Sequence, residues 1–280
     1  MAQLIDGKLI SQQIKDELKE EVAQFKAEGI DICLAVIQVG SDPASSVYVR
    51  NKKKACAYIG GVESRSYELP EETSEEELIK LVEELNADES VNGILVQLPV
   101  PDHIDEDKII RTISPDKDVD GFHPVSVGRL WIGEKGFLSC TPAGIIQLLK
   151  RSNISIEGKE CVIIGRSNIV GKPMAALLLR ENGTVTVAHS RTKDLKEVAK
   201  RADILIVAIG KERFITSEYI KEGAVVIDVG MHRDEANHLC GDIDFADVEP
   251  HSSAITPVPG GVGPMTIAML MNNCVETVRK

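Results

Sequence analysis

Aromatic residues are scarce in this sequence. Phe, Trp and Tyr together make up 4% of its 280 residues, so platforms for stacking the bases of single-stranded nucleic acid are few. Acidic side chains outnumber basic ones by 44 to 32, which gives a formal charge of −12 and repels a phosphate backbone. We therefore expect no nucleic-acid partner, and an anionic ligand would need a local basic pocket.

The sequence also lacks the patterns of metal sites, secretion and membrane insertion. Its six cysteines form no Cys-x-x-Cys pair and its six histidines show no ligand spacing, so we expect thiols in the core rather than a zinc site or disulfides. The first residues lack a charged segment followed by an apolar one, and no apolar run approaches the roughly 18 residues of a membrane span. The sequence predicts a cytoplasmic protein with no signal peptide, no membrane contact and no metal.

Strand and helix patterns alternate along the chain, without internal repeats. Apolar runs predict strands at Cys33–Val39, Val62–Leu69, Gly93–Leu98, Cys161–Ile164, Val185–Val187, Ile204–Ala208 and Val225–Val229. Helical spacing or helix-start signals appear at Ile10–Phe25, Asp42-Pro43, Ser74–Glu77, Thr141-Pro142 and Thr266–Val278. This alternation is typical of parallel sheets with helices on both faces.

Between Ser114 and Gly136 the periodicity disappears and turn residues accumulate, which predicts a domain boundary. We expect two α/β domains, 1–120 and 121–265, with the helix of about 266–280 packing back onto the first. Such folds bind ligands at the carboxyl ends of their strands. The predicted active site is therefore a cleft between the domains.

One glycine-rich segment follows a predicted strand and precedes a predicted helix. It reads Gly165-Arg166-Ser167-Asn-Ile-Val-Gly171. A glycine at the strand end permits a tight turn, and free N–H groups at the helix start attract phosphate. Ser167 replaces the second glycine of the G-x-G-x-x-G fingerprint. We interpret the segment as the pyrophosphate loop of a Rossmann-like unit, with glycine used for packing alone as the alternative.

The next strand ends at Ala188-His-Ser190-Arg-Thr192, where an NAD-binding unit usually carries a carboxylate for the ribose 2′-hydroxyl. This segment has no carboxylate; it has Ser190 beside Arg191, and Arg166 lies in the glycine turn. Arginine forms charge-assisted hydrogen bonds with a 2′-phosphate. The sequence therefore favours NADP over NAD, with a solvated basic loop as the alternative.

Other candidate residues lie in the first predicted domain. Tyr48 and Lys52 are four residues apart and share one helix face, where a partly desolvated amine can transfer protons. The alternative is that Lys52 belongs to a solvated basic run. Gln97 follows a buried strand and Asp120 precedes Gly121. A carboxylate there could hold a pterin-like or purine-like ring, although either residue could simply form a turn.

The segment from Pro257 to Thr266 is too rich in Gly and Pro to be a core element. We expect a rigid loop at Pro259, Gly260 and Gly261 whose backbone approaches a ligand. The alternative is a proline-rich helix entry that binds nothing.

Together these segments closely resemble bifunctional methylenetetrahydrofolate dehydrogenase/cyclohydrolase. The matching strings, in the order of the family, are Asp42-Pro-Ala-Ser with Tyr48 and Lys52-x-Lys54-Ala55, Gly93-Ile-Leu-Val-Gln-Leu-Pro99, Lys117-Asp-Val-Asp-Gly-Phe-His-Pro124, Cys140-Thr-Pro-x-Gly144, Gly165-Arg-Ser-x-Ile-Val-Gly-x-Pro-Met174 and Pro257-Val-Pro-Gly-Gly-Val-Gly-Pro-Met-Thr266. They span nearly the whole chain. Ser126 departs from the family pattern, which usually carries Asn, and this puts the contacts of its loop in doubt.

The resemblance implies two reactions. Hydride passes from 5,10-methylenetetrahydrofolate to NADP, and water then converts 5,10-methenyltetrahydrofolate into 10-formyltetrahydrofolate. It implies that residues 1–120 bind folate and 121–265 bind NADP, in a homodimer formed through the cofactor domain. It implies that Lys52 transfers protons, that Gln97 helps to hold Lys52 and the water, that Tyr48 lies along the aminobenzoyl group and that Asp120 binds the pterin edge. The residues implied to contact NADP are Gly165, Arg166, Ser167, Ser190 and Met231. Those implied to line the folate side are Pro259, Gly260 and Gly261.

The sequence is also compatible with three other functions. One is an NADP dehydrogenase of a small hydroxy or keto acid, which would need an arginine clamp where this chain has Asp120. Another is an NADP-binding scaffold without catalysis, and a third is a chain with only one of the two activities.

Overall fold

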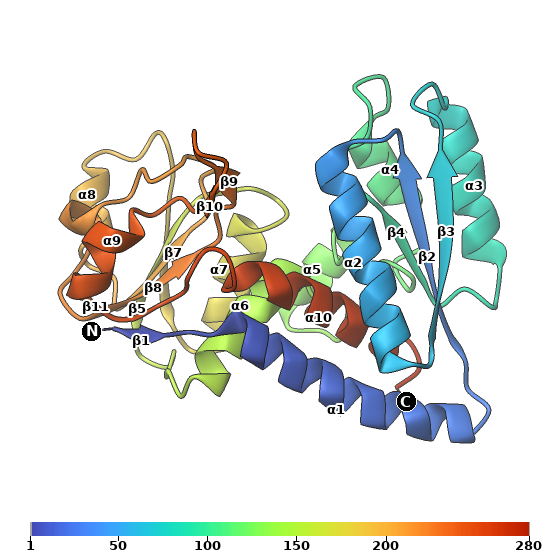
Figure 1. The fold of residues 1–280 in the computed structure, drawn as a ribbon, viewed down its shortest axis with the longest axis horizontal. Coiled ribbons are helices and arrows are strands. Elements are labelled where there is room, and N and C mark those ends of the chain that lie inside the picture. Colours follow the sequence, from blue (N-terminus) through green and yellow to red (C-terminus); the bar gives the residue numbers. More distant parts are fainter. Residues whose placement is uncertain (1, 280) are drawn as a thin grey trace. The chain divides into compact units, whose positions relative to one another are not determined.

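The computed structural model describes residues 2–279, apart from the side chains of Pro43 and Ala44, and divides into two compact units (Figure 1). Unit 1 comprises Met1–Ser11 and Ser139–Thr266, and unit 2 comprises Gln12–Leu138 and Ile267–Lys280. The cleft expected between two domains stays a prediction.

The division into compact units falls before Ser139, whereas the sequence predicts a domain boundary after Asp120. Residues 121–138 belong to unit 2 because hydrogen bonds tie them to it. The N–H of His123 donates to the Asp118 carboxylate at 2.8 Å, and Asn273 donates its amide to the Leu138 carbonyl at 2.9 Å. At the other end of the chain, Gln3 and Leu4 pair with a strand of unit 1.

Unit 2 is built on a parallel three-stranded sheet in the order β3-β2-β4. Its strands are β2 (Ile32–Val39), β3 (Val62–Leu69) and β4 (Gly93–Val96). Every residue of the central strand β2 is buried, as expected of a strand covered on both faces. Figure 1 shows α2 (Pro43–Ile59) on one side of this sheet and α3 (Glu75–Ala87) with α4 (Glu106–Thr112) on the other.

Two predicted helix starts in unit 2 are confirmed. The Asp42 carboxylate accepts the Ser45 N–H at 2.7 Å and caps α2. Ser74 and Glu77 form the predicted capping box of α3. Helices α4 and α5 (Pro124–Ile132) were not predicted. Helix α5 lies where the sequence shows no periodicity; it begins at a proline and is followed by Gly133, whose φ is +78°.

Unit 1 contains a parallel six-stranded sheet in the order β1-β11-β8-β7-β5-β6. Its strands are β1 (Gln3–Leu4), β5 (Glu160–Ile164), β6 (Thr184–Ala188), β7 (Ile204–Val207), β8 (Ala224–Asp228) and β11 (Ser252–Ile255). The intervening elements are α6 (Cys140–Arg151), α7 (Gly171–Arg180), α8 (Leu195–Ala199), η1 (Ser217–Tyr219), the β9–β10 hairpin (His232–Arg233 and Leu239–Cys240), α9 (Phe245–Val248) and η2 (Glu249–His251). The predicted parallel α/β architecture is confirmed.

Two helices have residues in both units, α1 (Gly7–Ala27) and α10 (Val262–Glu276). Helix α10 begins four residues before the predicted Thr266, inside the Gly/Pro-rich loop. Pro264 fits there because the first turn of a helix needs no N–H donor from that residue.

All six cysteines are free and buried, which confirms their interpretation as core residues. Within residues 2–279, no helix combines the length and the apolar character needed to cross a membrane.

Candidate active site

Three predicted residues of unit 2 form a polar cluster at the carboxyl end of its sheet. Helix α2 begins just after β2 and carries Lys52, whose Nζ donates to the Gln97 Oε1 at 3.0 Å. Gln97 follows β4, and its Nε2 donates to the Leu98 carbonyl at 2.7 Å. The two bonds together fix which way the Gln97 amide faces, so that its oxygen meets the amine.

Lys52 differs from the lysines beside it. Its side chain is only 7% exposed, whereas Lys53 forms an ion pair with Glu68 at 3.1 Å and Lys54 is exposed. A buried ammonium is costly unless polar groups surround it. The alternative of a solvated basic run therefore does not hold for Lys52.

Asp120 is half-buried and lies close enough to Lys52 for their charges to interact. Burial raises the pKa of the Asp120 carboxyl above its ordinary value, and the positive charge of Lys52 opposes this rise. Tyr48 lies one turn before Lys52 on α2, and burial raises the pKa of its phenol. The structure thus brings an amine, an amide and a carboxyl together, as expected from the sequence.

In unit 1, the glycine turn follows β5 as predicted. Gly165 has a φ of +135°, and its N–H donates to the Ala188 carbonyl at 2.9 Å. A Cβ on Gly165 would lie 2.2 Å from the Ala208 oxygen, and one on Gly171 would lie 2.4 Å from the Gly165 oxygen. Both positions therefore require glycine so that the turn can close onto α7.

The first N–H groups of α7 are not free, which corrects one part of the sequence interpretation. Ser167 Oγ accepts the N–H groups of Val170 at 3.2 Å and Gly171 at 3.4 Å, and the Ser167 carbonyl accepts that of Lys172 at 3.0 Å. Ser167 therefore occupies these N–H groups from the turn that leads into α7, although the N-cap residue of the helix is Val170.

The basic and hydroxyl residues predicted to choose the cofactor lie at one edge of the sheet. Ile164 of β5 pairs with Ala188 of β6, and Arg166 and Ser190 each follow two residues later. Both residues are exposed. Met231, 49% exposed, follows β8 at the same edge of the parallel sheet.

The loop at Pro259 contacts another part of unit 1. The Gly260 carbonyl accepts the Lys8 N–H at 3.0 Å, and a Cβ on Gly7 would lie 1.8 Å from the Gly261 oxygen. Gly260 and Gly261 are buried, whereas Pro259 is exposed. The close backbone approach in this structure is made to the first turn of α1, and the predicted approach to a ligand stays a prediction.

Two buried carboxylates that the sequence analysis did not identify organise the loops around Met231. Asp242 is fully buried and accepts the N–H groups of Ile209 at 2.7 Å and Lys211 at 2.9 Å. The ring of His232 also bonds to Asp242, at 2.7 Å. Asp228 accepts the N–H of Gly230 at 2.9 Å. The Gly241-Asp242 pair is a sequence signal for a turn, but the residues that donate to Asp242 lie 33 and 31 positions earlier, so their contact could not be predicted.

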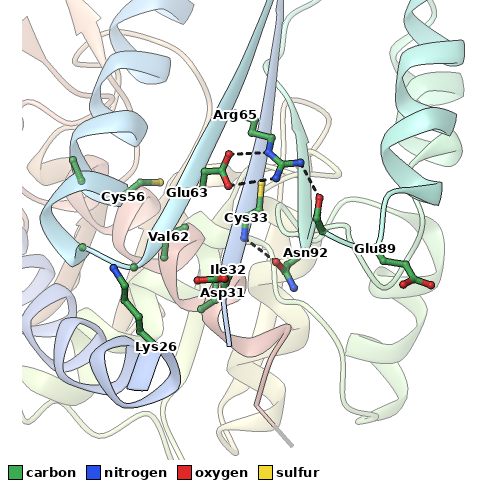
Figure 2. A pocket seen from close by; sticks show the side chains of 14 residues that line it. Lys26, Asp31, Ile32, Cys33, Cys56, Val62, Glu63, Arg65, Glu89 and Asn92 are labelled. Atoms are coloured by element: carbon green, nitrogen blue, oxygen red, sulfur yellow. Dashed lines mark hydrogen bonds and ion pairs between the residues drawn. The ribbon is translucent and has the colours of Figure 1, made fainter. Parts of the chain in front are cut away.

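A cavity of about 550 Å³ lies at the opposite end of the unit 2 sheet (Figure 2). It is lined by the starts of β2 and β3 and contains none of the predicted site residues. Figure 2 shows Arg65 and Glu63 facing each other, and their ion pair measures 2.8 Å. Because its arginine is already paired, we assign the chemistry to the Lys52 cluster instead.

The chain matches known proteins over nearly its whole length. Residues 5–120 match the family described as tetrahydrofolate dehydrogenase/cyclohydrolase, catalytic domain, and residues 139–280 match its NAD(P)-binding domain. A relative from Agathobacter rectalis named bifunctional protein FolD is 72% identical over 280 residues, covering 100% of both chains.

Two solved structures show the same fold over nearly the whole chain. The bifunctional FolD methylenetetrahydrofolate dehydrogenase/cyclohydrolase from Campylobacter jejuni is 52% identical, with a TM-score of 0.97 over 99% of this chain and 98% of that one. FolD from Trypanosoma brucei, solved with NADP and an inhibitor, is 39% identical, with a TM-score of 0.93 over 99% and 97%. This chain belongs to the bifunctional tetrahydrofolate dehydrogenase/cyclohydrolase family.

Proposed function

We propose that this chain oxidises 5,10-methylenetetrahydrofolate with NADP and then hydrolyses the product to 10-formyltetrahydrofolate. The observation that carries the proposal is the buried Lys52 amine, bonded to Gln97 and close to the Asp120 carboxyl. Such a cluster suits a nitrogen heterocycle that must gain and lose protons.

Asp120 would bind the N–H edge of the pterin, and Tyr48 would lie along the aminobenzoyl group. Lys52 would transfer protons during hydrolysis, while Gln97 holds its amine and the attacking water. Water adds to the one-carbon bridge of the methenyl group, and a C–O bond forms. The bond from that carbon to the pterin ring nitrogen N5 breaks, N5 receives a proton, and one proton is released to solvent.

The turn after β5 fits a dinucleotide phosphate. Gly165 leaves no room for a side chain at the strand end, so backbone can approach a pyrophosphate. Arg166 and Ser190 follow paired residues of β5 and β6, where they would hold a 2′-phosphate, with Ser167 in the same turn. When bound, NADP accepts the hydride, and Met231 would lie beside its nicotinamide half.

The loop of Pro259, Gly260 and Gly261 would line the folate side. Its anchoring to the start of α1 by the Lys8–Gly260 hydrogen bond at 3.0 Å supports a fixed wall rather than a mobile one. The exposed Pro259 would supply the contact with the ligand.

The chain would act as a homodimer formed through unit 1. Strand β6 is the last strand of its sheet, and its outer edge has no partner strand in the part of the chain described. Val187 on this strand is 38% exposed, and Leu179 at the end of α7 is 57% exposed. An open strand edge with apolar side chains favours pairing with a second copy.

Two absorbance measurements test the function. With methylenetetrahydrofolate and NADP, we expect NADPH to form and the methenyl absorbance to rise and then decay. With NAD in place of NADP, the absorbance of the reduced nucleotide should rise more slowly. Arg166→Ala should weaken the binding of NADP alone, so the rates with NADP and with NAD should become more similar. Absence of reduced cofactor with either nucleotide would contradict the proposal, and equal use of NAD and NADP by the unaltered chain would remove the role of Arg166.

A further inference from the structure

Asp118 is a buried carboxylate that no step of the proposed chemistry uses. It is 2% exposed and lies two residues before Asp120. Its oxygens accept the N–H of Phe122 at 3.2 Å and of His123 at 2.8 Å. The carboxylate therefore joins the chain on both sides of the turn that carries Asp120.

The backbone of the same turn is held at several further points. The Asp118 carbonyl accepts the Gly121 N–H at 2.9 Å, and the φ of Gly121 is +72°. The Val119 carbonyl accepts the amide of Asn273, on α10, at 2.8 Å. Asp120 is thus presented by a turn fixed at its start, its end and its middle.

Ser126 completes the arrangement. It is 1% exposed, and its hydroxyl donates to the Asp118 Oδ2 at 2.7 Å. Burial raises the pKa of Asp118 to about 6, while the donors of Ser126 and His123 oppose the rise by stabilising the carboxylate. Ser126, where the family pattern usually carries Asn, thus supplies a hydroxyl donor to this carboxylate.

We propose that Asp118 and Ser126 are positioning residues that hold the Asp120 turn in the geometry that binds the pterin ring. They touch no ligand themselves and act through Asp120, so the proposal rests on the proposed role of that carboxyl. Small displacements of a positioned group are costly, since about 1 Å can change rates by ~100-fold. The pair thus sets folate affinity in both reactions and leaves NADP affinity alone.

The test is Ser126→Ala, with KM for folate and for NADP measured separately from kcat. We expect the folate KM to rise by about tenfold or more in both reactions, with the NADP KM unchanged. Ser126→Asn supplies an amide donor to the same carboxylate and should restore the folate KM. A merely structural role would reduce the folded fraction, which lowers apparent kcat and leaves KM unchanged.

Ser252→Ala is the matched control. Ser252 is also a buried serine, whose hydroxyl donates to the Val248 carbonyl at 3.0 Å in unit 1. Its loss should lower the melting temperature without changing the folate KM. An unchanged folate KM in Ser126→Ala, or an equal rise in Ser252→Ala, would overturn the proposal.

Two further measurements distinguish a wrong positioning proposal from a wrong role for Asp120 and from a variant that does not fold. Asp120→Ala should raise the folate KM, and an unchanged KM would mean that the proposed role of Asp120 is wrong. If Asp120→Ala raises the folate KM and Ser126→Ala does not, the positioning proposal is wrong. Should Ser126→Ala not fold, hydrogen exchange in the unaltered protein decides. Slow exchange of the Phe122 and His123 amides is required, and fast exchange would overturn the proposal.

Discussion

Single buried carboxyls organise the loops of both units. Asp228 is 3% exposed, and two of the N–H groups that it accepts belong to Asp242 at 3.0 Å and Ile243 at 3.1 Å. These donors stabilise its charged form, but burial dominates and raises the pKa from 3.8 to about 7. At neutral pH, this carboxyl is therefore near its midpoint of titration.

The raised pKa of Asp228 has a consequence for stability. Below pH 3.8 the group is protonated in both states; as pH rises, the unfolded chain loses its proton first, and the folded chain loses it only near pH 7. The contribution of Asp228 to the free energy of unfolding should therefore fall between about pH 4 and 7 and stay constant above. Carbon-13 NMR of the aspartate carboxyls should show one buried group titrating near pH 7, absent from Asp228→Asn. Titration of that group near pH 4 would refute the expectation.

The sequence could predict which side chains lie together where those side chains follow the ends of paired strands. Lys52 and Gln97 follow strands that pair with each other, so the sequence could place them at one edge before any coordinates. The roles of Asp118 and Asp242 could not be predicted, because these carboxylates accept hydrogen bonds from backbone N–H groups, which almost every residue type supplies. The hydrogen bonds that Ser167 accepts from Val170 and Gly171 were missed for the same reason.

At the scale of the element, the turn between β5 and α7 depends on two glycines. A Cβ on Gly171 would lie 2.4 Å from the Gly165 oxygen and 2.7 Å from the Arg166 Cα. Both neighbours are backbone atoms, so neither can move aside without deforming the turn. The nucleotide loop is therefore intolerant of any side chain at this position.

Gly171→Ala should weaken NADP binding by at least about tenfold, or ~1.4 kcal/mol, in an isothermal titration. Hydrolysis of supplied methenyltetrahydrofolate, which needs no hydride acceptor, should continue. Gly128→Ala in α5 is the control, since a Cβ there meets nothing within 4 Å, and its NADP affinity should not change. Undiminished NADP binding by Gly171→Ala would show that the turn tolerates a side chain and that this account of it is wrong.

Most elements were predictable because their burial is regular. Strands β2, β4, β7 and β8 are buried throughout, whereas β3 and β6 carry polar, partly exposed residues. Two helix starts carry Asp42 and the Ser74 capping box. Strand β1 was missed because two residues carry no periodicity, and its position is set by pairing with β11. Helix α5 was missed because glycine and proline at its ends resemble a loop.

At the scale of the whole molecule, the chain combines a formal charge of −12 with anionic ligands. The basic side chains of Arg166 and Arg191 are exposed after β5 and β6, so positive charge is concentrated where phosphate would bind. The sequence predicts two units, and residues 121–138 join unit 2 through hydrogen bonds to Asp118 and Asn273.

The proposed homodimer predicts that charge on the open edge of β6 separates the subunits. Val187→Lys should sediment as a single chain, because burying a lysine at a strand edge is unfavourable. Val187→Thr keeps a β-branched side chain and should sediment at twice the mass of one chain. A dimeric Val187→Lys protein would place the interface elsewhere, and a monomeric unaltered protein would remove the dimer altogether.

The central claim is that the buried Lys52 amine transfers the protons of hydrolysis. Its most direct test measures both reactions in Lys52→Gln, with Lys54→Gln as control, since Lys54 is exposed on the same helix. We expect Lys52→Gln to lose methenyltetrahydrofolate hydrolysis by at least ~100-fold while some NADP reduction persists, and Lys54→Gln to keep both reactions. Hydrolysis by Lys52→Gln at the rate of the unaltered chain would contradict the account.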